Sequence, residues 1–193
     1  MPPAVAAIAV ALLLTGCAGD GAPSTPVPSS STPPTTSPTP TSTASADPNA
    51  PAEQCADDAL KVEVTYVDAG AGSTDYSIVF TNTGSGSCEL RGAPGVSVVN
   101  ASGVQIGEAA ARQGDENPPT LTLQPGTSVS APLQAVNIAP DGGPLDDCPV
   151  MEGAAFFVYP PHSFTGFTAA TGDPVPACES TTSFLTVGPV QAN

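Results

Sequence analysis

The chain has 193 residues, of which 18 are acidic and only three are basic, so its formal net charge is −15. The three basic residues are Lys61, Arg91 and Arg112. Because nucleic acids and anionic lipid surfaces are bound through basic patches, this composition argues against both as partners.

A leader peptide is the first predicted element. Residues 4–14 form an uninterrupted apolar run. The run is shorter than the roughly 20 residues of a membrane span and has the length of the apolar part of a signal peptide. It ends in Leu14-Thr15-Gly16-Cys17, which has the form of a lipobox. We therefore expect residues 1–16 to be a lipoprotein signal peptide and Cys17 to carry the lipid. The segment before the run lacks Lys and Arg, so we expect the natural start to lie upstream of Met1.

A tether is predicted over residues 17–51. From residue 20 on, Pro, Ser and Thr dominate, and almost no aliphatic side chain is present to offset the entropy of ordering. Proline at this density favours an extended backbone, which would reach up to roughly 100 Å from a membrane. An unmodified spacer and an O-glycosylated stalk both fit this composition.

The remaining residues, 52–193, have the length of one domain. Once Cys17 is assigned to lipid, four cysteines are left in the domain, and an even number in an exported domain implies disulfides. Of the three possible pairings we favour Cys55 with Cys88 and Cys148 with Cys178, because each closes a loop of about 30 residues and contributes about 3–4 kcal/mol. The cysteine spacing does not fit a zinc site.

Short strands are predicted through most of this domain. Residues 60–67 and 76–81 alternate apolar with polar side chains, which is the period of a half-buried strand. Turns are predicted at 82–86, at 100–103 within a hairpin, and at 124–127, where Pro-Gly suits a type II turn. Residues 109–113 could form one helical turn at most. Further strands are predicted at 96–99, 104–106, 121–123, 128–133, 155–159, 164–167 and 184–187.

This pattern predicts an all-β, antiparallel β-sandwich with a small aliphatic core. The order of motifs also resembles domain of unknown function 4232, a family found mainly in secreted proteins and lipoproteins of actinobacteria. The resemblance covers roughly residues 55–189 and implies an immunoglobulin-like fold and an envelope location, without an activity or a catalytic residue. Ala93 departs from the family, whose members often carry an aromatic residue there. The motifs are Cys55, Phe80-Thr81-Asn82-Thr83-Gly84, Cys88-Glu89-Leu90-Arg91-Gly92, Pro94-Gly95-Val96, Leu123-Gln124-Pro125-Gly126 and the two late cysteines.

Catalytic patterns are weak in this sequence. A Ser-His-Asp arrangement needs an imidazole, and His162 is the only one in the chain. Ser163 follows it directly, but adjacent residues of an extended chain point to opposite faces. We therefore interpret His162, which follows Pro160-Pro161, as an exposed loop residue and not as a catalytic base.

Acidic clusters are the other candidate sites. Asp141, Asp146 and Asp147 surround a Gly-Gly turn and could bind Ca²⁺, but their spacing matches no calcium loop and Asp favours turns anyway. A glycosidase pair of carboxylates would become visible only in three dimensions, and the scarcity of Trp and Tyr for stacking on sugars argues against it. Weaker clusters are Asp57-Asp58 and Asp115-Glu116.

The functional expectation is a non-enzymatic, lipid-anchored binding or interaction module on the outer face of the cell membrane. Its expected partners are the membrane, through the lipid, and an envelope protein or a cell-wall glycan. No cofactor, catalytic residue or metal ligand is assigned. A carboxylate-dependent hydrolase and a carrier of a small ligand or Ca²⁺ are the alternatives.

Overall fold

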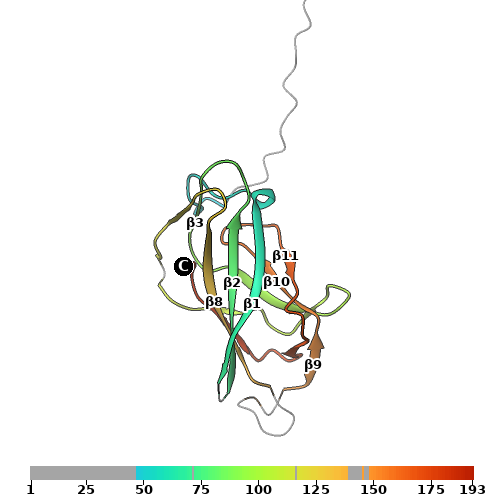
Figure 1. Ribbon diagram of the computed structural model, residues 1–193. Helices are drawn as coiled ribbons and strands as arrows, with labels where there is room; N and C mark the ends of the chain where they lie inside the picture. The colour runs from blue at the N-terminus through green and yellow to red at the C-terminus, as the bar shows by residue number, and fades with distance from the viewer. Residues whose placement is uncertain (1–46, 71, 116, 139–144, 146–147) are drawn as a thin grey trace, which may run out of the picture. The chain divides into compact units, whose positions relative to one another are not determined.

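The computed structural model describes residues 47–70, 72–115, 117–138, 145 and 148–193. These residues form a nearly all-β domain with two main sheets, which share one hydrophobic core. Figure 1 shows β1, β2 and β8 in one layer and β10 and β11 in the other. The predicted β-sandwich is confirmed. Residues 1–16, Cys17 and most of the predicted tether lie outside the described part of the chain.

The first sheet has the order β1-β2-β8-β13-β6, and β14 also pairs with β8. All its pairings are antiparallel except that of β13 with β6, which is parallel. The sequence pattern predicts antiparallel pairing only. The chain reaches β6 from the other main sheet, and such a crossover does not force the antiparallel direction that a hairpin does. The strands are β1 (Leu60–Gly70), β2 (Ser73–Asn82), β6 (Ala111–Arg112), β8 (Ser128–Val136), β13 (Leu185–Val187) and β14 (Gln191–Ala192).

The second main sheet has the order β11-β10-β4-β5 and is antiparallel throughout. Two small sheets pair β3 with β7 and β9 with β12, and a short 3₁₀ turn, η1, precedes β1. The second main sheet contains β4 (Gly95–Val99), β5 (Gln105–Ile106), β10 (Ala155–Tyr159) and β11 (Phe167–Ala169). The remaining elements are η1 (Asp57–Ala59), β3 (Cys88–Leu90), β7 (Leu121–Leu123), β9 (Val150–Gly153) and β12 (Val175–Cys178).

The core lies between the two main sheets because the long strands alternate. Every second residue of β8 from Val129 to Ala135 is buried, and Ile78 and Phe80 of β2 are buried opposite them. Tyr76 of β2 meets Phe156 of β10 edge to face, with ring centroids 5.1 Å apart. This aromatic contact joins the two sheets.

Both predicted disulfides are present. Cys55 is bonded to Cys88 and Cys148 to Cys178, across sequence separations of 33 and 30 residues. The first ties the segment before β1 to β3, and the second ties the segment before β9 to the end of β12. Each bond therefore holds a short strand that has few backbone hydrogen bonds of its own.

Some local predictions fail. The hairpin around 100–103 is confirmed, since β4 pairs with β5, but the helical turn expected at 109–113 is wrong because β6 lies there. The strand expected at 164–167 begins at Phe167, because the segment before it turns sharply at residues 160–163. The predicted turn at 124–127 is closed by a hydrogen bond from the Thr127 amide to the Gln124 carbonyl, 3.0 Å long. Within the described ranges we find no helix with the length and hydropathy needed to cross a membrane.

Candidate binding site beside His162

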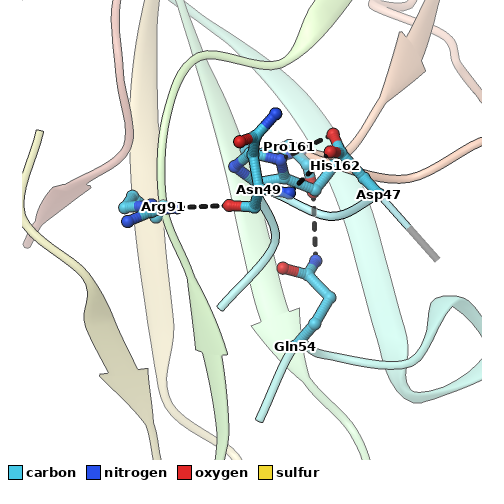
Figure 2. A network of polar contacts seen from close by, with 6 residues as sticks. All are labelled: Asp47, Asn49, Gln54, Arg91, Pro161 and His162. Atoms are coloured by element: carbon cyan, nitrogen blue, oxygen red, sulfur yellow. Dashed lines mark hydrogen bonds and ion pairs between the residues drawn. The ribbon is translucent and has the colours of Figure 1, made fainter. Parts of the chain in front are cut away.

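The described chain begins with a short segment, residues 47–54, that is attached to the loop after β10. Figure 2 shows this network of polar contacts. The His162 imidazole Nδ1 lies 2.9 Å from the Asp47 carboxylate Oδ2. The Arg91 guanidinium donates to the backbone carbonyl of Asn49. Although residues 47–51 fall within the predicted tether, these contacts place them against the domain.

The end of the same segment is held by backbone pairing. The Glu89 amide donates to the Glu53 carbonyl at 2.7 Å, and the Cys55 amide donates to the Glu89 carbonyl at 3.0 Å. The side-chain amide of Gln54 donates to the Pro161 carbonyl at 3.0 Å. Segment 47–54 therefore connects β3 to the loop after β10, two parts of the chain that are far apart in sequence.

The loop after β10 has a strained backbone at His162. Its φ of 60° lies in the left-handed region, and it is the only non-glycine residue with positive φ among those that the structure describes. The Ser163 amide donates to the Pro160 carbonyl at 3.0 Å, and the Ser163 hydroxyl donates to Asp57 Oδ1 at 2.6 Å. These bonds and the contact with Asp47 hold the loop in this conformation.

The expectation that His162 is solvent-exposed is wrong, because only 17% of its side-chain surface is exposed. The cause is segment 47–54, which covers the imidazole. Ser163 bonds to Asp57 and His162 to Asp47, but the chain at His162 is turned and not extended as the sequence argument assumed.

The hydrogen bonds of Asp47 favour the ionised form of its carboxyl group. The Asn49 amide donates to Asp47 Oδ1 at 2.9 Å, and this bond, followed by the hydrogen bond with His162, holds the pKa of the Asp47 carboxyl below its ordinary value. At neutral pH the carboxylate is therefore ionised, and it forms one wall of the opening beside His162.

A cavity of about 340 Å³ opens at this place, and we call it the His162 cavity. Two of the three basic side chains of the whole protein and its single imidazole line it. The lining residues are Asp47, Arg91, Gly92, Ala93, Arg112, Tyr159, Pro160, Pro161, His162, Ser163 and Phe164.

The two arginines reach the cavity from different elements. Arg91 follows β3 and is partly buried, whereas Arg112 lies on β6 and is exposed, with its Nε 3.5 Å from the Pro94 carbonyl. In the part of the chain that the structure describes, no carboxylate lies within 4.0 Å of either guanidinium. The third basic residue, Lys61, is paired with Glu63 at 2.9 Å on β1 and does not line the cavity.

The rim of the His162 cavity is aromatic. Phe164 is 73% exposed and Tyr159 is 39% exposed, and Tyr159 is supported edge to face by Phe157 at a centroid distance of 5.2 Å. Ala93 lies in the wall between Arg91 and the second main sheet. A small residue at this position leaves space that a larger side chain would fill.

A larger cavity, of about 580 Å³, lies along β2, β8 and β13. Among the described residues that line it, Asp75 alone is charged, and its carboxylate accepts a hydrogen bond from Gln134 at 2.9 Å. This cavity has no basic side chain in its described wall and no cluster of side chains there that indicates a ligand or a reaction. The His162 cavity is the better candidate site.

The acidic clusters of the sequence are not gathered into a site. Asp57 accepts from Ser163, and Asp58 and Asp115 are exposed. Within the described residues there is no group of three or more His, Cys, Asp or Glu side chains that could hold a metal ion. Asp141, Asp146, Asp147 and Glu116 lie outside the described residues, as does Cys17.

Asp47, Arg91 and Arg112 were not predicted as site residues. The scarcity of bases singled out Arg91 and Arg112 as two of three basic residues, but it does not indicate that they meet. Nothing in the sequence, however, indicates that Asp47 would meet His162 from 115 positions away.

The fold and the site define a disulfide-bonded β-sandwich-like domain that has a small cationic cavity covered on one side by its own N-terminal segment. Residues 55–191 match the family described as Domain of unknown function (DUF4232). The chain belongs to this family, as the order of its motifs indicated. No curated protein matches the chain.

Proposed function

We propose that the protein is a cell-envelope lipoprotein whose β domain is a non-enzymatic binding module. Lipid on Cys17 anchors it to the outer face of the cell membrane, and the Pro/Ser/Thr tether extends the domain toward the cell wall. The lipobox and the composition of the tether support the anchoring. The two disulfides fit an oxidising compartment outside the cytoplasm.

The observation that carries the binding role is the His162 cavity. It concentrates cations in a strongly acidic chain and has exposed aromatic rings at its mouth. Ligand sites combine apolar surface with a few directed polar groups, and this cavity has both.

The hydroxyl next to His162 has a structural partner. A hydrolytic triad needs the serine hydroxyl on the imidazole, whereas the Ser163 hydroxyl donates to Asp57 Oδ1 and so holds the loop against η1. The contact of His162 Nδ1 with Asp47 holds segment 47–54 against the loop. These bonds favour a role for His162 and Ser163 in shaping the cavity.

Site-specific photo-crosslinking in the native envelope tests the binding role. A photoreactive residue replaces Phe164 on the rim, and a control replaces Val104, which is 60% exposed in the hairpin between β4 and β5. We expect a discrete crosslinked product from position 164 that is absent at 104 and is lost when Arg112→Ala is added. Equal products at both positions, or none at 164, would contradict the proposal.

A further inference from the structure

The charge of the His162 cavity identifies the chemistry of its ligand. Arg91 and Arg112 contribute two positive charges and ionised Asp47 one negative charge, so these three side chains sum to +1. A single carboxylate balances this charge. A phosphate dianion would leave an uncompensated negative charge beside Asp47, which like-charge repulsion disfavours.

The arginines suit a carboxylate in geometry as well. A guanidinium presents several N–H donors in one plane, which matches the two oxygens of a carboxylate. One Arg91 nitrogen is engaged by the Asn49 carbonyl, which fixes the guanidinium against segment 47–54. Arg112 is exposed, and its hydrogen bond within the described residues is a long one, 3.5 Å from Nε to the Pro94 carbonyl.

The rim indicates what the carboxylate is attached to. Phe164 and Tyr159 present exposed rings at the mouth, where the C–H face of a sugar ring can pack. The volume of about 340 Å³ lies at the lower end of the range for small-ligand cavities. A monosaccharide unit fits these features better than a long peptide does.

We propose that the His162 cavity binds a saccharide that carries a carboxylate, with Arg91 and Arg112 contacting the carboxylate and Phe164 and Tyr159 contacting the ring. This inference rests on the proposed binding function and names the class of its ligand. Carboxylated sugars are available to a domain that faces a cell wall, and a free small carboxylate shares the same anionic group.

Calorimetric titration of the full chain, kept soluble in a mild detergent, tests the proposal. The probes are N-acetylmuramic acid, N-acetylglucosamine, which lacks the lactyl carboxylate, and free lactate, which lacks the sugar. We expect saturable binding of N-acetylmuramic acid at millimolar concentrations and binding at least about tenfold weaker for the other two. Binding of N-acetylglucosamine as tight as that of N-acetylmuramic acid would overturn the carboxylate role. Equally tight binding of lactate would overturn the saccharide role.

Two variants and one control locate the site. Arg112→Ala should weaken the binding of N-acetylmuramic acid by about tenfold or more, whereas Lys61→Ala, which removes the same charge from β1, should leave it unchanged. Ala93→Phe should fill the cavity and weaken binding while both arginines remain. Equal losses in the Arg112 and Lys61 variants would mean that net charge, and not the cavity, controls binding. The melting temperature of each variant separates lost binding from lost folding.

The two experiments distinguish failure of this ligand class from failure of the proposed function. Absence of saturable binding to all three probes would overturn the ligand class, while a crosslink from position 164 would still support a binding module. Conversely, saturable binding in the calorimeter without a crosslink in the envelope would support the carboxylate site. It would contradict the envelope role.

Discussion

At the residue scale, Asn82 shows how a motif of ordinary turn residues is used. Its side chain is fully buried at the end of β2. The amide nitrogen donates to the carbonyls of Gly86 and Leu123, at 2.8 and 3.0 Å, and the amide oxygen accepts from the Gly84 amide at 2.9 Å. One side chain therefore joins the turn after β2 to β7.

Asn82→Asp should destabilise the fold by about 2–4 kcal/mol, since it removes both donations and points a carboxylate at two carbonyl oxygens in a buried place. Chemical denaturation at neutral pH measures this loss. Thr81→Ser, which keeps the neighbouring part-buried hydroxyl contact with Ser128, is the control and should change stability little. A small effect of Asn82→Asp would contradict the role assigned to the amide nitrogen.

Asp47 should give the protein a defined pH dependence. Its folded-state pKa lies below the ordinary value near 4, so its contribution to stability is present above that value and is lost as the pH falls through the lowered pKa. Asp47→Asn should therefore lower the melting temperature at pH 7, and the difference from the natural chain should shrink well below pH 4. A difference that stays constant from pH 7 to strongly acidic pH would show that the carboxylate charge is not involved.

At the element scale, strands could be predicted where they are long and have one buried face. Residues 60–67 and 76–81 alternate because one side meets the core, and β1 and β2 are found there. Three short strands, β5, β7 and β13, were also predicted, at 104–106, 121–123 and 184–187. The other strands of two to four residues carry too short a pattern, and β12 even contains Pro176. The parallel pairing of β6 depends on a crossover between sheets, which local periodicity does not encode.

The close approach of β5 and β12 is an element contact that mutation can test. A Cβ at Gly107, just after β5, would overlap the carbonyl oxygen of Cys178, whereas a Cβ at Gly103 would meet nothing, although both glycines have positive φ. We expect Gly103→Ala to cost about 1 kcal/mol, for backbone strain alone. Gly107→Ala should cost about 3 kcal/mol or more. Thermal unfolding of the two variants compares them, and similar losses would contradict the close approach.

At the scale of the whole molecule, the sequence predicted the β domain and both disulfides but not the candidate site. Long alternating strands can be recognised within one stretch of sequence, and an even number of cysteines is a simple count. The site instead needs Asp47, Arg91, Arg112 and His162 to converge from four separate stretches of chain. Their convergence depends on the packing of both sheets, so no single window of sequence carries it.

The lipid anchor is the main whole-molecule prediction. Cys17→Ser should release the protein from membranes, because two or more acyl chains provide firm anchoring and the serine cannot form the thioether. Fractionation of cells followed by immunodetection measures the distribution. An Ala18→Ser variant, which leaves the thiol intact, should stay in the membrane fraction. Retention of the Cys17 variant in membranes would refute the lipid assignment.

Segment 47–54 also has a mechanical consequence. It is held by hydrogen bonds, including the contact between Asp47 and His162, whereas Cys55, immediately after it, is bonded covalently to β3. Force applied at the N-terminal side should detach these eight residues first. The chain should lengthen by about 30 Å before the sandwich unfolds. Single-molecule stretching would register this as an early, reversible step, and its absence would contradict the order of rupture. A load on the tether would thus remove one wall of the His162 cavity while the sheets stay paired. Ligand binding would then depend on the applied force.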